Sequence, residues 1–147
     1  IKTLLKLCPN GKVQGIDYSA VSVEKARKVN AGAIAAGRCT VQQASVAELP
    51  FGSEQFEVVT AFETVYFWPE LVQNFREVYR VLKPGGVFFI CNEANGETAK
   101  DDKWTQIING MTIYTDTALK AYLEQAGFCK IQSHKNKKGW LCITAQK

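Results

Sequence analysis

The stretch Val13-Gln14-Gly15-Ile16-Asp17 is an apolar run that ends on a single acidic residue. Residues 20–37, which follow after a short polar link, have the spacing of a helix. A carboxylate at the carboxyl end of a parallel strand lies at the edge of an open α/β sheet, where it can accept hydrogen bonds from ribose hydroxyls. Asp17 is therefore a candidate nucleoside-binding residue. The alternative is that Asp17 only helps Ser19 to cap the helix that follows.

Strands and helices are expected to alternate outward from this stretch. Helices are predicted over residues 1–8, 20–37, 69–82 and 116–126, and a short one around Trp104. The segment 20–37 is expected to be one continuous helix. Pro69 is expected in the first turn of the helix that ends at about Leu82. Strands are predicted over residues 12–17, 39–44, 56–62, 87–91, 128–134 and 140–145, with Pro84-Gly85-Gly86 as a turn before the fourth of them. This order predicts an α/β fold with a doubly wound, mostly parallel sheet that finishes with an antiparallel hairpin.

The composition is that of an ordinary globular protein. The chain has 147 residues, of which 46% are hydrophobic and 22% charged, and this length suits one domain. No apolar run approaches the roughly 20 residues that cross a bilayer, and no signal peptide opens the chain, so we expect a cytoplasmic protein without a membrane partner. The net charge of +4 is small, and its densest patch, Lys135 to Lys138, falls at an expected hairpin tip. A solvated turn is favoured there over a nucleic-acid surface.

The five cysteines are an odd number without close pairing. This pattern favours reduced, mostly buried thiols over a disulfide framework or a zinc site, and no metal is expected. His134, the single histidine, falls in a terminal strand and is expected to be structural.

In their order along the chain, these segments resemble the class I S-adenosylmethionine-dependent methyltransferases. Asp17 stands where that family places the acidic residue for the cofactor ribose, and Ser45 to Phe51 looks like the loop that holds the adenine. Phe56 to Val59 resembles the family's fourth strand, and Val81 to Gly86 its turn before the fifth. The resemblance implies a Rossmann-like fold, S-adenosylmethionine as the cofactor, and cofactor contacts from Asp17, Tyr18, Ser45, Val46 and Phe62.

Two departures from the family accompany this resemblance. Ser45 stands where the adenine loop usually carries an acidic residue. The family's first strand and glycine-rich loop are absent, which would leave roughly 9 to 10 Å between the strands at 12–17 and 56–62. We therefore expect residues 1–147 to be a single methyltransferase-like domain that is an N-terminally truncated fragment of a longer protein.

Methyl transfer needs an aligned acceptor, and a hydroxyl acceptor benefits from a general base. Glu63, just past the strand at 56–62, is the candidate base, with a solvated or capping glutamate as the alternative. Tyr66 and Trp68 are candidates for the wall of a substrate pocket, although aromatic residues near a strand end also serve simple packing. Trp104 and Tyr114 fall in the segment that family members use to cover the substrate.

Two other classes of function stay open at this point. A nucleotide-binding oxidoreductase would also use Asp17, on a nicotinamide ribose. A non-catalytic binding domain is compatible with the missing glycine-rich loop. The Pro84-Gly85-Gly86 turn and the terminal hairpin resemble those of methyltransferases and argue against an oxidoreductase. For the complete protein we expect methyl transfer to a small-molecule acceptor. The sequence names neither that acceptor nor an oligomeric state.

Overall fold

The structure is a computed structural model that describes residues 1–147, except for the side chains of Ala99, Lys100 and Asp102. The chain divides into two compact units, Ile1–Ser45 and Val46–Lys147. Each unit contains its own β-sheet.

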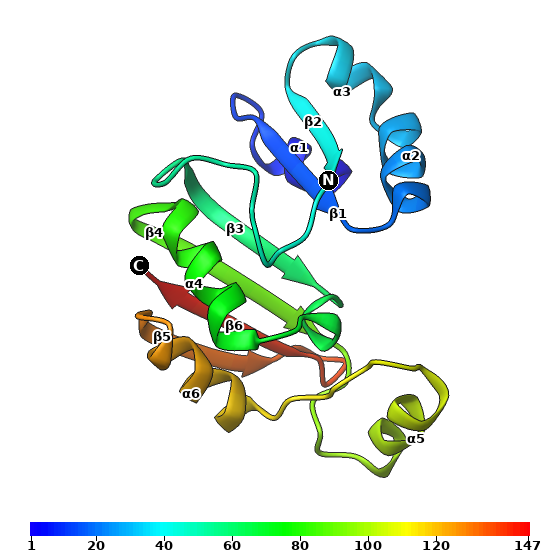
Figure 1. The fold of residues 1–147 in the computed structure, drawn as a ribbon, viewed down its shortest axis with the longest axis vertical. Coiled ribbons are helices and arrows are strands. Elements are labelled where there is room, and N and C mark those ends of the chain that lie inside the picture. The colour runs from blue at the N-terminus through cyan, green and yellow to red at the C-terminus, as the bar shows by residue number, and fades with distance from the viewer. The chain divides into compact units, whose positions relative to one another are not determined.

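The first unit is a parallel strand pair with helical connections (Figure 1). Its elements are α1 (Lys2–Leu7), β1 (Val13–Asp17), α2 (Ala20–Val29), α3 (Ala31–Ala35) and β2 (Cys39–Gln43). The two strands run parallel in a continuous register from Val13 opposite Cys39 to Asp17 opposite Gln43. A small core forms around Val23, Cys39 and Val41, with Ile1, Leu5, Ala26, Ala33 and Ile34 packed against it.

Two close contacts hold α1 on this strand pair. Gly15 leaves room for Ile1, because a Cβ at Gly15 would lie 2.7 Å from the Ile1 Cδ1 atom. The Arg38 guanidinium donates to the carbonyls of Leu5 (3.1 Å) and Cys8 (2.7 Å), which joins the end of α1 to the start of β2. These bonds satisfy carbonyls that a helix end leaves without partners.

The prediction of one helix over 20–37 is wrong, because the helix breaks at Asn30. The Asn30 backbone has φ −109° and ψ 17°, and its side-chain amide donates to the Ala26 carbonyl at 2.7 Å. Asparagine side chains compete in this way with the regular bonds of a helix. The helical segment still ends at Gly37, whose φ of +69° suits glycine.

The second unit is a four-stranded mixed sheet. Its elements are β3 (Phe56–Phe62), the 3-10 helix η1 (Val65–Phe67), α4 (Leu71–Val81), β4 (Leu82–Asn92), α5 (Ala99–Ile107), α6 (Asp116–Gln125), β5 (Cys129–Lys135) and β6 (Leu141–Gln146). The strand order is β3-β4-β6-β5, in which β3 and β4 are parallel and the other two pairs are antiparallel. The expected terminal antiparallel hairpin is therefore confirmed.

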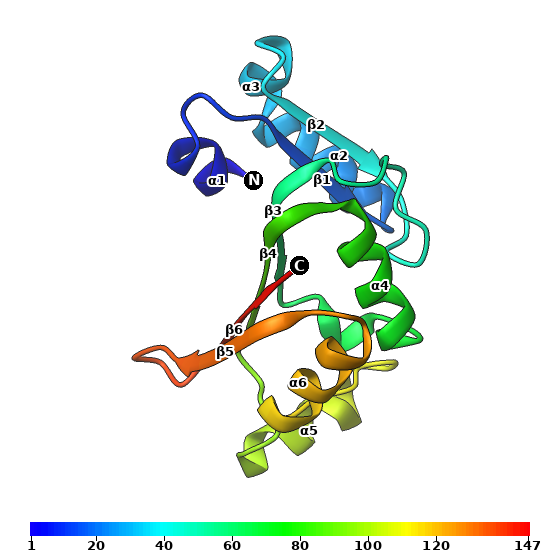
Figure 2. The same ribbon diagram turned by 90° about the vertical axis from the view of Figure 1, so that its left-hand side faces the viewer.

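Helices α4 and α6 cover the same face of this sheet (Figure 2). The apolar residues of α4 recur at helical spacing, so that Leu71, Phe75, Val78 and Val81 are all buried. Phe75 meets Phe88 of β4 with ring centroids 5.6 Å apart. This aromatic contact joins the helix to the centre of the sheet.

Two boundaries differ from the prediction. Pro69 lies before α4 rather than in its first turn, because Glu70 is the N-cap residue and has a left-handed φ of 42°. Strand β4 begins at Leu82 and includes Pro84 to Gly86, which were expected as a separate turn. The chain does bulge there, since Leu82 pairs with Phe56 and Val87 with Val58.

All five cysteines are free thiols, of which Cys39, Cys91 and Cys142 are buried. Over the described residues, no helix combines the length and the apolar character that a bilayer crossing requires.

Candidate functional site

Asp17 ends β1 with a side chain that is already oriented. Its Oδ1 atom accepts a hydrogen bond from the Ser19 N–H at 2.9 Å. Ser19 is the N-cap of α2, because its Oγ atom accepts from the Ser22 N–H at 3.3 Å. This hydrogen bond uses Oδ1, and the carboxylate has a second oxygen, Oδ2. The contact with Ser19 agrees with the capping alternative for one oxygen and leaves the binding role open for the other.

The backbone around Asp17 joins the carboxyl ends of β1 and β2. The Ala44 N–H donates to the Asp17 carbonyl at 3.1 Å, and the Gln43 side chain donates to the Tyr18 carbonyl at 2.9 Å. The Tyr18 side chain is 73% exposed, and Ser45 is also exposed. Asp17, Tyr18 and Ser45 thus lie together at one end of the parallel pair in the first unit.

In the second unit, the loop that begins at Val46 is anchored to α4. Glu77 accepts from the Leu49 N–H at 3.0 Å, and Arg80 donates to the carbonyls of Leu49 (3.1 Å) and Phe51 (2.8 Å). Glu77 and Arg80 also pair with each other at 2.8 Å, and this hydrogen bond lowers the pKa of Glu77. Sequence reasoning did not identify this anchor. The sequence did contain one signal for the ion pair, because Glu77 and Arg80 are three residues apart on a predicted helix and therefore lie on the same face.

Phe62 and Glu63 lie at the carboxyl end of β3. Phe62 is 49% exposed, and its ring is tilted against that of Phe89 at 5.6 Å. Glu63 has a left-handed φ of 55°, and its N–H donates to the Cys91 carbonyl of β4 at 3.0 Å. Such a backbone conformation costs energy for a non-glycine residue and occurs often at functional sites.

The Glu63 carboxylate is held by two hydrogen-bond donors. Its Oε1 accepts from the Glu93 N–H at 2.6 Å, and its Oε2 accepts from the Tyr66 hydroxyl at 3.3 Å. Partial desolvation raises the pKa of Glu63, the neighbouring Glu93 carboxylate raises it further, and the two hydrogen bonds oppose the change. The side chain is still accessible to solvent. An oriented, accessible carboxylate with a raised pKa can take a proton from a bound acceptor.

The two aromatic candidates that follow Glu63 are placed differently from each other. Tyr66 is only 3% exposed and makes its polar contacts through its hydroxyl group. Trp68 packs on two buried aromatic residues, with its ring stacked on Phe88 at 6.2 Å and edge-on to Phe75 at 5.9 Å. The packing alternative accounts for the position of Trp68, and a contact with substrate stays a prediction.

Trp104 and Tyr114 lie in and after α5. Trp104 is 49% exposed. The Thr112 N–H donates to the Tyr66 carbonyl at 2.9 Å, which places the segment before Tyr114 beside η1. Tyr114 also lines a hollow of about 260 Å³ together with Glu70, Leu71, Val72, Gln73 and Tyr122. Tyr114 and Tyr122 are edge-on at 6.0 Å.

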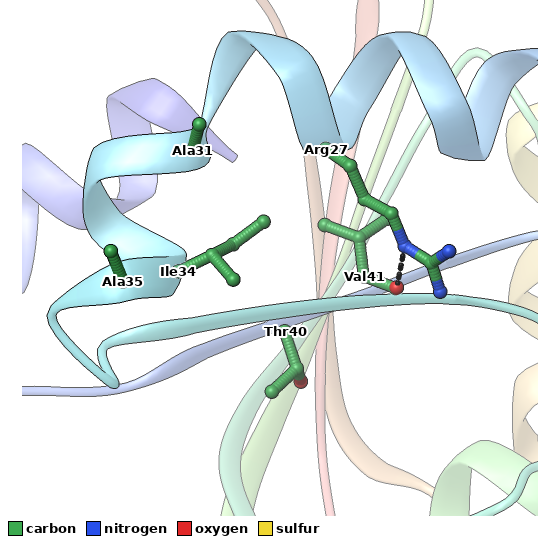
Figure 3. A pocket seen from close by; sticks show the side chains of 6 residues that line it. All are labelled: Arg27, Ala31, Ile34, Ala35, Thr40 and Val41. Atoms are coloured by element: carbon green, nitrogen blue, oxygen red, sulfur yellow. Dashed lines mark hydrogen bonds between the residues drawn. The ribbon is translucent and has the colours of Figure 1, made fainter.

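A larger hollow of about 530 Å³ lies in the first unit (Figure 3). Its lining is mostly apolar and consists of Arg27, Ala31, Ile34, Ala35, Thr40 and Val41. The Arg27 guanidinium donates a hydrogen bond there to the Val41 carbonyl at 2.8 Å. None of the predicted site residues lines this hollow. Among the side chains that the structure describes, no group of three or more His, Cys, Asp or Glu residues could hold a metal ion.

Known proteins resemble this chain both in sequence and in fold. A demethylmenaquinone methyltransferase from Symbiobacterium thermophilum is 36% identical over 90 residues, which are 61% of the chain and 36% of that protein. An arsenite methyltransferase from Halobacterium salinarum is 31% identical over 126 residues, which are 82% of the chain and 32% of that protein. The chain thus spans about a third of the length of these curated relatives.

Among solved structures, a SAM-dependent methyltransferase from Aquifex aeolicus matches with a TM-score of 0.80 at 17% identity, over 99% of the chain and 74% of that structure. This likeness confirms the predicted Rossmann-like methyltransferase fold. Residues 1–90 match the family described as "Methyltransferase domain". Because this match covers more than half of the chain, the chain belongs to the methyltransferase-domain family.

Proposed function

We propose that the complete protein transfers a methyl group from S-adenosylmethionine to a small-molecule acceptor. Membership of the methyltransferase-domain family carries this proposal. The relatives act on different acceptors by name, demethylmenaquinone in one case and arsenite in another. Both names denote small molecules, which supports the acceptor class and leaves its identity open. The cytoplasmic location expected from the sequence stays a prediction.

The cofactor-binding role rests on Asp17. Its Oδ1 is held by the Ser19 N–H, and we assign Oδ2 to a ribose hydroxyl. Tyr18 and Ser45, which lie at the same end of the strand pair, are proposed to contact the adenosine. The cofactor contacts of Val46 and Phe62 stay predictions from the sequence. The exposed ring of Phe62 offers an apolar surface for such a contact.

Glu63 is proposed as the base that accepts a proton from the acceptor. When bound, S-adenosylmethionine supplies a methyl group on a positively charged sulfur. The Glu93 N–H and the Tyr66 hydroxyl hold the Glu63 carboxylate in one orientation. Positioning of this kind supplies much of the rate in a displacement reaction. We propose that four aromatic side chains enclose the acceptor: Tyr66, Trp68, Trp104 and Tyr114. The hydrogen bond from the Thr112 N–H to the Tyr66 carbonyl joins the segment before Tyr114 to the segment that contains Tyr66 and Trp68.

Isothermal titration with S-adenosylhomocysteine and, separately, with NAD tests this function. Two proteins are compared: the 147-residue chain, and the same chain extended at its N-terminus by the first strand and glycine-rich loop of a relative. We expect the extended protein to bind S-adenosylhomocysteine and not NAD. The 147-residue chain should bind more weakly, because no glycine-rich loop holds the methionine end.

Each result decides between the classes of function. Binding of NAD alone would favour an oxidoreductase. If the extended protein bound neither ligand, a non-catalytic domain would be favoured. Low-micromolar binding by the 147-residue chain would show that the missing loop is not needed.

A further inference from the structure

The Tyr66 hydroxyl is a junction between two segments that follow neighbouring strands. It accepts a hydrogen bond from the Ala94 N–H at 2.9 Å. It also lies within hydrogen-bond distance of two acceptors, the Ala94 carbonyl at 3.1 Å and Oε2 of Glu63 at 3.3 Å. The Tyr66 backbone carbonyl in turn accepts from the Thr112 N–H. Tyr66 therefore joins the segments after β3, after β4 and after α5.

A tyrosine hydroxyl carries a single proton, so it can donate to only one of these two acceptors at a time. Burial raises the pKa of Tyr66 above its usual value, and the Glu63 carboxylate adds to this effect. The hydroxyl consequently stays protonated near neutral pH and acts only as a donor toward these acceptors. Which acceptor receives the proton depends on the charge of Glu63, because a carboxylate is a stronger acceptor than a carbonyl.

We propose that Tyr66 is a positioning residue for Glu63. The hydroxyl proton of Tyr66 points to the Glu63 carboxyl group when that group is ionised, and to the Ala94 carbonyl when that group is protonated. This inference rests on the proposed role of Glu63 as the base. In the ionised state, Tyr66 and the Glu93 N–H together fix both carboxylate oxygens of Glu63. In the protonated state, the turn of the hydroxyl releases Oε2 and transfers the bond to the segment after β4.

The charged groups around this junction favour the protonated form of Glu63. Glu93 on the segment after β4 raises the pKa of Glu63, and Asp101 of α5 adds to the negative potential at Tyr66. Cys91 of β4 is a buried neutral thiol, because burial raises its pKa to about 12. None of these groups supplies a positive charge to Glu63. The Tyr66 hydroxyl and the Glu93 N–H are thus the groups that stabilise its ionised form.

Nuclear magnetic resonance of the chain labelled with ¹³C at the tyrosine Cζ and glutamate Cδ positions tests the proposal. During a pH titration, we expect the Cζ signal of Tyr66 to move with the same midpoint as the Cδ signal of Glu63. In Glu63→Gln, which keeps the size of the side chain and loses its charge, the Tyr66 signal should no longer move at this midpoint. Tyr79 serves as the internal control, since it packs on Phe128 away from Glu63. A Tyr66 signal that stays constant while Glu63 titrates would overturn the proposal.

A second measurement uses Tyr66→Phe, with Tyr79→Phe as the matched loss of a tyrosine hydroxyl. The titration midpoint of Glu63 should rise in Tyr66→Phe, because the ionised form loses one of its two donors, and it should stay the same in Tyr79→Phe. An unchanged midpoint in folded Tyr66→Phe would contradict the proposal. If Tyr66→Phe does not fold, the titration of the unsubstituted chain still decides.

The result of these titrations can be distinguished from the result of the tests of methyl transfer. The titrations report the hydrogen bond between Tyr66 and Glu63 whether or not the protein transfers methyl groups. If the titrations behave as expected and Glu63→Gln keeps full methyl transfer, the base role of Glu63 fails and the proton switch at Tyr66 stands. If the titrations fail and the protein binds S-adenosylhomocysteine, the positioning role alone is lost.

Discussion

Single side chains at the ends of β1 and β3 carry the proposed chemistry. Asp17 is the last residue of β1 and Glu63 directly follows β3. The carboxylate of each accepts a hydrogen bond from a backbone N–H, that of Ser19 or of Glu93. The identity of both residues was evident from the strand pattern. Their orientation was not, because the donors Ser19 and Glu93 act through backbone groups that any residue could supply.

Asp17→Ala should weaken the binding of S-adenosylhomocysteine by roughly 1.5 to 3 kcal/mol, as expected for a hydrogen bond to a charged group. This corresponds to an increase in Kd of about 10- to 150-fold. Isothermal titration of the extended protein measures it. Glu24→Ala is the control, since Glu24 lies on the exposed surface of α2 in an ion pair with Lys28. Equal affinity of Asp17→Ala and the control would rule out the ribose contact.

Glu63→Gln should lower the rate of methyl transfer by about 10²- to 10⁴-fold, the usual contribution of a general base. The affinity for S-adenosylhomocysteine should stay the same, because Glu63 is assigned to the acceptor. The rate of the unsubstituted protein should rise with pH through the raised pKa of Glu63, since the base acts when ionised. A rate profile that is identical in Glu63→Gln would show that another group titrates.

The same raised pKa sets the sign of a stability effect. The folded state binds the Glu63 proton more tightly than the unfolded state, so this group makes stability fall as pH rises from the unfolded to the folded pKa. Glu63→Gln removes this dependence. The difference in melting temperature between Glu63→Gln and the unsubstituted chain should therefore shift in favour of Glu63→Gln as pH rises from the usual pKa of a glutamate through the raised pKa of Glu63, as measured by circular dichroism.

At the scale of elements, the bulge at the start of β4 depends on close backbone approach. A Cβ added to Gly86 would lie 2.8 Å from the Lys83 carbonyl oxygen and 3.2 Å from that of Glu57. Both are backbone atoms, which cannot move aside as a flexible side chain can.

Gly86→Ala should therefore destabilise the chain by about 1 to 3 kcal/mol, as overpacking typically does. Gly52→Ala is the control in the same unit, because the nearest atom to its added Cβ is 4.0 Å away, at the end of the Gln55 side chain. Urea unfolding followed by fluorescence compares the two variants. Equal midpoints would show that the bulge can relax around a methyl group.

At the scale of the whole molecule, the two units differ in the size of their cores. The first unit ends at Ser45 and has a small core around Val23, Cys39 and Val41. The second unit buries a larger set that includes Phe75, Phe88, Leu119 and Ile143. A unit of such short length buries only a modest part of its surface and is marginally stable by itself.

Hydrogen exchange should reflect this difference. We expect the amides of β1 and β2 to exchange faster than those of β4 and β6, which lie between two neighbouring strands in the four-stranded sheet. Mass spectrometry of peptides from both units measures the rates. Protection of β2 equal to that of β6 would contradict the expectation and would indicate that the chain opens as one cooperative unit.

The amino-acid sequence by itself determined the order of strands and helices, the family, and the candidate residues at strand ends. These features depend on local apolar spacing and on residues such as Gly37 and Gly127, whose positive φ angles end helices. Tertiary structure alone decided the anchoring of the loop at Leu49 by Glu77 and Arg80, and the junction that the buried Tyr66 hydroxyl makes with Ala94. Both depend on hydrogen bonds between residues far apart in the chain. A single sequence does not show which distant partners meet.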